Sequence, residues 1–194
     1  MTALALAVVA HLSLMYAPDA TVPWIMAAGY GTALLSVVLV LKLLHLRLHK
    51  GEDQRPLIGP EIAARACDVL LFVGAGYSTH IEPGVIKLFG VLPLGWSCAI
   101  AALLLEYIGA LGLARGLDCR HSWAWAGGSS RLVMLAVGSL SQAAVNLLRY
   151  RADNDASQME TFLLLILVFC LFDGVRSARS LAAASRSTAA PDTP

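Results

Sequence analysis

Two acidic residues lie inside segments that are otherwise apolar. Asp68 falls three residues after Arg65, so on a helix the two side chains lie about one turn apart on the same face. Glu106 lies nine residues before Arg115, within another apolar segment. An ionised carboxylate in hydrocarbon costs at least about 2.5 kcal/mol, so each acid needs a partner, water or a cavity. Each could form a structural ion pair or hydrogen bond, or could line a polar site.

Several arginines fall at ends of apolar segments that we assign to the same side of a membrane. Arginine binds phosphate through two parallel hydrogen bonds, so such a group could hold a lipid head group or a nucleotide diphosphate. The alternative is topological, because basic residues collect at the cytoplasmic ends of membrane helices without any ligand. The sequence assigns no catalytic residue. The candidates for binding substrate or phosphate are Arg47, Arg65, Asp68, Glu106 and Arg131.

The elements that carry these residues are membrane helices. The mean hydropathy is +0.70, and 14% of the residues are charged, against about a quarter in soluble domains. We therefore expect an all-α fold, a polytopic membrane protein with six transmembrane helices. The apolar runs that predict these helices cover residues 1–17, 22–46, 63–78, 94–114, 131–148 and 159–175.

The distribution of basic residues predicts the orientation of these helices. With a cytoplasmic N-terminus, eleven Lys and Arg residues lie inside and three outside, which favours cytoplasmic positions for both termini. We expect a six-helix transmembrane domain over 1–176 and a flexible cytoplasmic tail over 177–194. The membrane would be a bacterial-type inner or plasma membrane, with the polar site on its cytoplasmic face. The net charge of +1 predicts no nucleic-acid partner.

The histidines and cysteines do not form a metal-binding pattern. His45 and His49 are spaced for one helix face, but only His11 lies well inside an apolar run. A haem anchor needs paired histidines on facing helices within the membrane. The four cysteines include no C-x-x-C motif, so we expect them to be packing residues. No cofactor is predicted from these residues.

Three pieces of the chain together resemble the CDP-alcohol phosphatidyltransferase family. They are LRLHKGEDQRP running into PEIAARACDVLLF, the segment ending LLLEYIGALG with an arginine-bearing loop after it, and GGSSRLVMLAVGSL at the start of the fifth helix. The resemblance covers roughly residues 22–176. It implies phospholipid synthesis, in which an alcohol displaces CMP from a CDP-linked lipid at the cytoplasmic interface. The implied partners are membrane lipids and a CDP-linked lipid, and the chain could form a homodimer.

The family signature, D-x-x-D-G-x-x-A-R, eight residues and then G-x-x-x-D-x-x-x-D, departs from this sequence at its acids. When the signature is laid along the chain, its arginine falls on Arg47, and Arg65 follows its last acid. In the family the four aspartates hold divalent cations. Their positions here fall on Leu39, Lys42, Pro60 and Ala64. Mg²⁺ or Mn²⁺ would bind only at a substitute site, which could draw on Glu52, Asp53, Glu61 and Asp68.

Three functions remain open at this point. The chain could be a CDP-alcohol phosphatidyltransferase-like transferase, if chemistry is retained. It could be a non-catalytic membrane protein that binds a lipid or a protein partner on the same scaffold, which the missing aspartates favour. It could also be a small transporter or a redox membrane anchor, supported by Glu106 and the scattered histidines. We further expect the second and third helices to lie side by side, with Arg47 and Arg65 opening into one cytoplasmic cavity.

Overall fold

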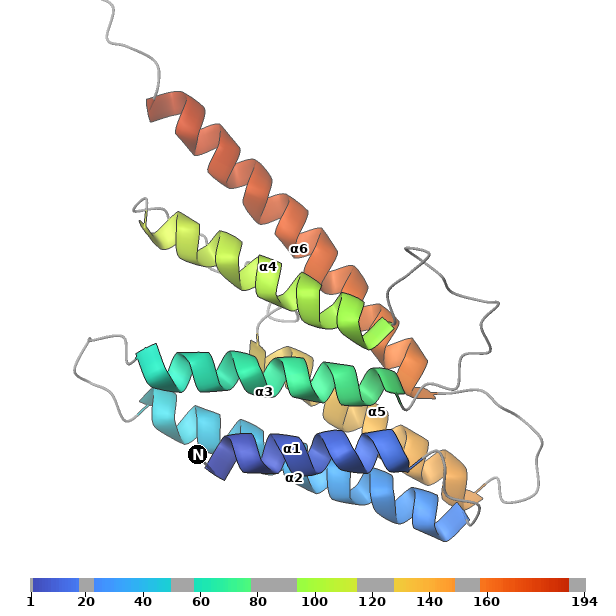
Figure 1. Cartoon of the computed structure of the whole chain (residues 1–194). Coiled ribbons are helices and arrows are strands. Elements are labelled where there is room, and N and C mark those ends of the chain that lie inside the picture. Colours follow the sequence, from blue (N-terminus) through green and yellow to red (C-terminus); the bar gives the residue numbers. More distant parts are fainter. Residues whose placement is uncertain are drawn as a thin grey trace, which may run out of the picture.

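The described part of the chain is entirely helical apart from Ala17 (Figure 1). The computed structural model describes residues 2–17, 23–49, 58–77, 94–114, 128–148 and 158–188. Their six helices are α1 (Thr2–Tyr16), α2 (Pro23–His49), α3 (Ile58–Tyr77), α4 (Leu94–Ala114), α5 (Gly128–Leu148) and α6 (Gln158–Thr188). The predicted all-α class is confirmed, and each predicted segment corresponds to one helix.

Four of these helices are long and apolar enough to cross a membrane, namely α2, α4, α5 and α6. α1 is apolar but has only 15 residues. α3 has 20 residues and carries three charged ones, Glu61, Arg65 and Asp68. Six membrane spans therefore stay a prediction, whereas a membrane protein with several apolar helices is indicated.

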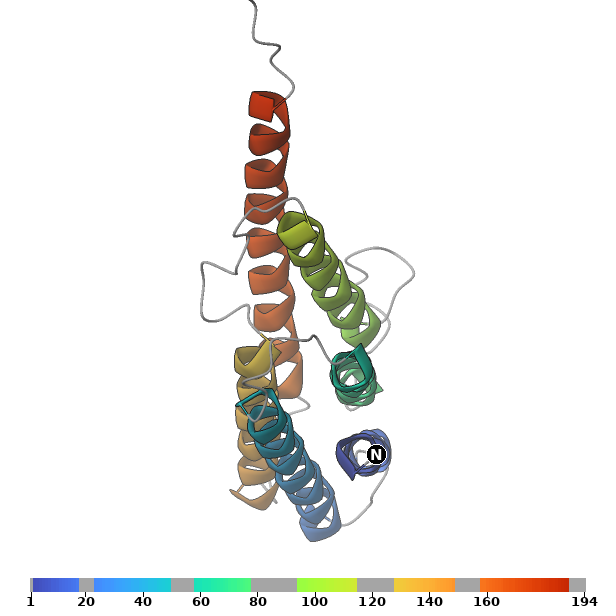
Figure 2. The same cartoon turned by 90° about the vertical axis from the view of Figure 1, so that its left-hand side faces the viewer.

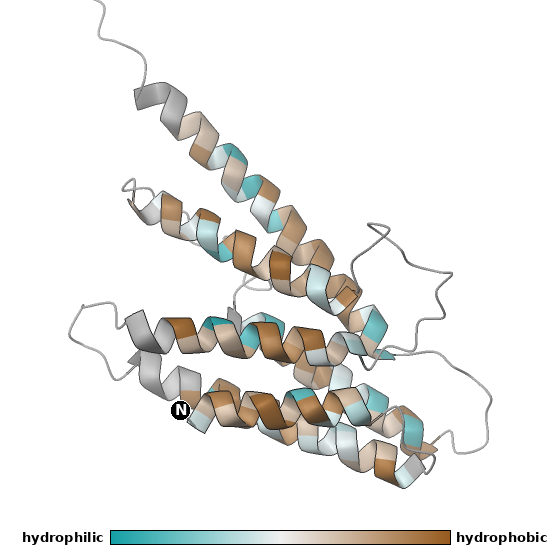
Figure 3. Ribbon diagram, in the orientation of Figure 1, coloured by the Kyte–Doolittle hydropathy of each residue, from teal (hydrophilic) through white to brown (hydrophobic). Residues whose placement is uncertain are grey.

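Apolar side chains are exposed on every one of the six helices. Figure 3 shows hydrophobic residues distributed along their length, with hydrophilic residues in short patches. In water such a surface would be unfavourable, but it suits a protein surrounded by lipid. One exposed example from each helix in turn is given by Val8, Leu35, Ile62, Leu104, Val137 and Val168.

α6 extends further than the sequence predicted. We expected its helix to end near residue 175 and a flexible tail to begin at Ser177, but the helix continues through Thr188. The segment after Ser177 is rich in alanine, which has the highest helix propensity, and contains neither Gly nor Pro before Thr188. Figure 1 shows this end of α6 reaching beyond the other helices. Residues 189–194 lie outside the described part.

The helices form two groups. α2 packs against α5 and α1, and α1 packs against α3, so these four make one group. α4 packs closely on α6 and makes the second group, which contacts the first through α3 and α5 (Figures 1 and 2). α2 contacts α3 only slightly. The expected close pairing of the second and third helices is therefore wrong, because α1 occupies that side of both.

Consecutive helices run in opposite directions, so the bundle has two ends. We call the end that holds Thr2 and the starts of α3 and α5 the proximal end, and the other end the distal end (Figure 1). Every Lys and Arg in the described helices belongs to the proximal half of the bundle or to the extension of α6 beyond it. These residues are Lys42, Arg47, Arg65, Arg131, Arg176, Arg179 and Arg186.

Glycines allow the helix backbones to approach closely toward the distal end. A Cβ atom on Gly76 of α3 would lie 2.7 Å from the Cα of Gly95 of α4. A Cβ atom on Gly138 of α5 would lie 3.1 Å from the side chain of Phe162 of α6. Small residues at such crossings favour close packing of helices in membranes.

Gln142 of α5 caps the start of α6. Its Oε1 atom accepts hydrogen bonds from the backbone N–H of Gln158 at 2.8 Å and of Met159 at 3.4 Å. These are two of the N–H groups that a helix start leaves without a helical partner. The Gln142 amide also donates to Asn146 Oδ1 at 3.2 Å. One side chain thus joins α5 to α6.

Replacing Gln142 with leucine should destabilise the start of α6 by about 1–2 kcal/mol, the usual loss for a helix cap. Hydrogen exchange at Gln158 and Met159 should accelerate, because both N–H groups lose their acceptor. Asn146→Leu is the matched control, since it removes the Gln142–Asn146 bond but keeps the cap. Equal exchange rates in the two variants would contradict the capping role.

Candidate functional site

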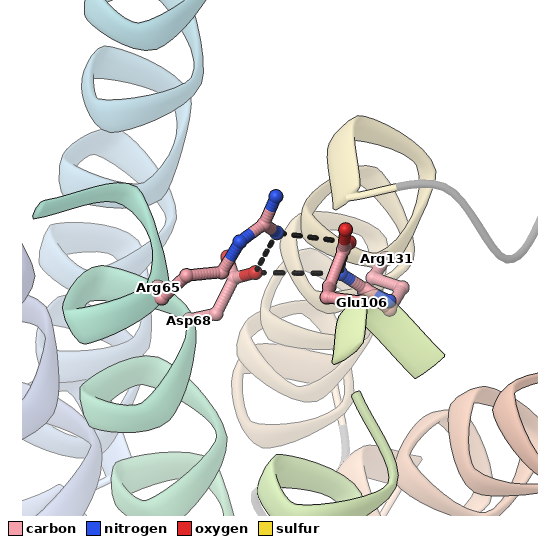
Figure 4. A network of polar contacts seen from close by, with 4 residues as sticks. All are labelled: Arg65, Asp68, Glu106 and Arg131. Carbon is pink, nitrogen blue, oxygen red and sulfur yellow. Dashed lines mark hydrogen bonds and ion pairs between the residues drawn. The ribbon is translucent and has the colours of Figure 1, made fainter. Parts of the chain in front are cut away.

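Four charged side chains from three helices meet in the proximal half of the bundle (Figure 4). Arg65 and Asp68 come from α3, Glu106 from α4 and Arg131 from α5. We call these four residues the charge cluster. Arg131 Nη2 lies 2.8 Å from Glu106 Oε1 and 3.5 Å from Asp68 Oδ2. Arg65 Nη1 lies 2.9 Å from Glu106 Oε1 and 3.6 Å from Asp68 Oδ2.

The cluster contains two arginines and two acids, so its formal net charge is zero. Each arginine contacts both acids. The two contacts to Glu106 have the length of strong, charge-assisted hydrogen bonds, whereas those to Asp68 are longer and mainly Coulombic. Glu106 therefore links α4 to both α3 and α5 through short ion pairs.

The cluster has a buried side and an open side. Arg131 is fully buried at 0% exposure and Asp68 is 5% exposed. The side chains of Arg65 and Glu106 retain 30% and 22% of their exposure. A buried charge is stable only when it is paired, so Arg131 depends on the two acids beside it. Arg65 is the cation of the cluster that a ligand can reach.

Arg65 presents hydrogen-bond donors to the outside of the cluster. Both of its ion pairs are made by Nη1. Figure 4 shows its second terminal nitrogen pointing away from both acids. Within the described part of the chain, the guanidinium group makes no other ion pair. An anion could thus bind to Arg65 without first breaking its contacts to Asp68 and Glu106.

Local sequence and helix direction together build this arrangement. Arg65 and Asp68 share one face of α3 through their i, i+3 spacing, as predicted. Arg131 lies in the first turn of α5, and Glu106 lies in the second half of α4. Antiparallel packing brings these positions to the same level. Four of the five predicted candidates therefore come together.

The fifth candidate, Arg47, lies in the last turn of α2, and its side chain is outside the described part. The cavity that we expected between Arg47 and Arg65 is outside it for the same reason. Of the predicted substitute metal site, Asp68 is in the cluster, while Glu52, Asp53 and the side chain of Glu61 are not described. In the described residues, no three His, Cys, Asp or Glu side chains are grouped as metal ligands.

Two buried residues of α6 lie near this level and were not selected from the sequence. Cys170 is 1% exposed, and its thiol interacts with the Arg131 side chain. Asp173 is also 1% exposed. An acid inside an apolar run was the signal that selected Asp68 and Glu106, and the same signal would have found Asp173.

His11, the histidine that lies well inside a predicted apolar run, has a structural partner. Its Nδ1 atom lies 2.8 Å from the carbonyl oxygen of Leu70, and its ring meets Tyr77 edge-on at 6.4 Å. These contacts join α1 to α3. Gly74 makes room for them, because a Cβ atom there would lie 2.8 Å from the His11 Cα.

The fold and the site together define a class: an all-helical protein with several helices suited to a membrane, built around a partly buried charge cluster with no formal net charge. Comparisons with protein-family models, curated proteins and solved structures found no match to the chain.

Proposed function

We propose that the chain is a membrane protein that binds a phosphate-bearing lipid, with Arg65 as the contacting residue. It does so on a scaffold similar to that of the CDP-alcohol phosphatidyltransferases, but without the transfer reaction. The observation that carries this proposal is the partly exposed Arg65, held in place by Asp68 and Glu106 while its remaining donors point outward. Guanidinium donors in this arrangement suit a phosphate oxygen.

The distribution of charge supports a cytoplasmic location for this site. All described Lys and Arg residues belong to the proximal half or to the extension of α6. Basic residues at one end of a helix bundle mark the cytoplasmic side of membrane proteins. In this proposal six helices span the membrane, both termini are cytoplasmic, and the charge cluster lies below the cytoplasmic surface.

The residue types argue against transfer by the mechanism of that family. Leu39 and Lys42 stand where the alignment requires aspartates, and neither can coordinate a divalent cation. Asp68 and Glu106 each already contact two guanidinium groups. Their negative charge is therefore neutralised within the cluster, which leaves little attraction for a metal ion.

Replacing Arg65 with glutamine should weaken binding of CDP-diacylglycerol by about tenfold or more, the effect of losing one charge-assisted hydrogen bond. Arg65→Lys should give an intermediate loss, because an ammonium group lacks the paired donors of a guanidinium group. Binding can be measured by native mass spectrometry of the protein in nanodiscs. The matched control is Arg179→Gln, an exposed arginine on α6 that should leave the affinity unchanged.

A transfer assay separates binding from catalysis. CDP-diacylglycerol and candidate alcohols would be incubated with the protein, with and without Mg²⁺ or Mn²⁺. Saturable binding without turnover would support the proposal. Turnover that requires the cation would instead make the chain a transferase with displaced ligands. Equal affinities for the wild type and Arg65→Gln would refute Arg65 as the contacting residue.

A further inference from the structure

The two helix groups are joined in different ways at their two ends. Toward the distal end the backbones of α3 and α4 touch at Gly76 and Gly95, and Gln142 of α5 caps α6. The glycine contact leaves no room for a side chain or a water molecule between α3 and α4. This end is therefore a close-packed joint.

Toward the proximal end the groups separate. Figure 1 shows α4 and α6 diverging from α3 in this direction. The described polar contacts across the separation run through long side chains of the charge cluster (Figure 4). Glu106 of α4 reaches both Arg65 and Arg131, and Arg131 also interacts with Cys170 of α6.

We propose that the charge cluster is a latch and that the Gly76–Gly95 contact is its pivot. In the closed state Glu106 holds α4, together with α6, against α3 and α5. When Glu106 loses its hold on Arg65 and Arg131, α4 and α6 swing outward as one unit about the glycine contact. Exchangeable ion pairs at one end and close backbone packing at the other favour this hinge motion over separation of the whole bundle.

The latch also provides a way for the ligand to regulate the site, and this part rests on the proposed function. A phosphate-bearing head group that binds the outward donors of Arg65 adds a second negative charge to this guanidinium group, which weakens the Arg65–Glu106 ion pair without displacing it first. Ligand binding should therefore favour the open state, to the extent that the ligand binds that state more tightly.

Native cysteines provide the readout. Cys170 is buried and interacts with Arg131 across the latch, so opening should expose it to a thiol reagent. Cys98 is fully buried between α4 and α6, where its thiol donates to the carbonyl oxygen of Leu163 at 3.2 Å. Because α4 and α6 move together, Cys98 should stay covered.

The test measures maleimide labelling of both cysteines, peptide by peptide, in nanodiscs. Glu106→Gln removes the charge of the latch and keeps its shape. It should raise the labelling rate of Cys170 by about tenfold, with less than about a twofold change at Cys98. The matched control is Glu160→Gln, an acid-to-amide change in the first turn of α6, which should alter neither rate.

Other outcomes would overturn the latch. If the labelling rates of Cys98 and Cys170 rise in parallel, the whole bundle has loosened. If the rate of Cys170 does not change, Glu106 does not keep α4 and α6 in the closed position. If Glu106→Gln fails to fold, Arg65→Gln tests the same motion by removing one of the two arginines that Glu106 contacts, and it should give a smaller rise at Cys170.

A second arm of the experiment adds CDP-diacylglycerol to the wild-type protein. Faster labelling of Cys170 would support both the latch and the proposed ligand. If Glu106→Gln exposes Cys170 but the lipid neither binds nor accelerates labelling, the latch stands and the proposed function fails. If the lipid binds but the Glu106→Gln variant labels like the wild type, the proposed function stands and the latch fails.

Discussion

Replacing Arg131 with methionine should lower the free energy of unfolding by about 3–5 kcal/mol, the usual penalty for removing one partner of a buried ion pair. The side chain is fully buried and contacts both acids of the cluster. Methionine fills similar space but leaves Asp68 and Glu106 to share Arg65. One negative charge then remains uncompensated in a buried site. Unfolding in SDS, followed by circular dichroism, measures the change.

A second substitution separates charge from packing. Asp68→Asn in the Arg131→Met background removes the surplus negative charge and should restore part of the lost stability. If the loss came from packing alone, the added substitution would give no recovery. Arg176→Met, which changes an exposed arginine on α6, is the matched control and should alter stability by less than about 0.5 kcal/mol. A cost below about 1 kcal/mol for Arg131→Met would show that the cluster tolerates an unpaired acid.

Replacing Gly95 with alanine should destabilise the protein by about 2–3 kcal/mol, near the upper end of the penalties for overpacking. The added Cβ atom would collide with the carbonyl oxygen of Phe72 and would lie 2.8 Å from the Cα of Gly76. Both neighbours are backbone atoms, so no side-chain rotation can relieve the clash. α3 and α4 would have to move apart where they now touch.

The control for this change is Gly31→Ala in α2. A Cβ atom on Gly31 meets nothing within 4 Å, so this substitution should be neutral or should stabilise the helix by up to about 1 kcal/mol. Thermal unfolding in the same detergent compares the two variants. Similar melting temperatures for both variants would show that α3 and α4 can move apart at their crossing without loss of stability.

The helices could be predicted from the sequence because a long apolar run directly indicates a helix suited to a lipid environment. The predicted segment 94–114 coincides with α4. The end of α6 was predicted less well, because a helix can continue where hydropathy falls. Alanine-rich residues after Ser177 continue α6 without needing a lipid environment, so hydropathy alone ended the helix too early.

The charge cluster was only partly predictable. The Arg65–Asp68 pair follows from helix periodicity, and the need of Glu106 for a partner follows from its apolar surroundings. That Arg131 is this partner depends on which helices become neighbours, which the hydropathy of single segments does not report. The pairing of α2 with α3 was wrongly expected for the same reason, because segment hydropathy does not report that α1 packs against both of them.

The length of α6 constrains how the molecule sits in a bilayer. With 31 residues, the helix is about 46 Å long, against about 30 Å of hydrocarbon. Hiding all of it would require a tilt near 50°, beyond the range of about 40° found for membrane helices. If α6 crosses a bilayer, it should therefore leave the membrane roughly 20 residues after its start, close to Arg176 and Arg179. Its last three turns would then stand in the aqueous phase as a rigid rod that holds Thr188 at a fixed height above the lipid surface.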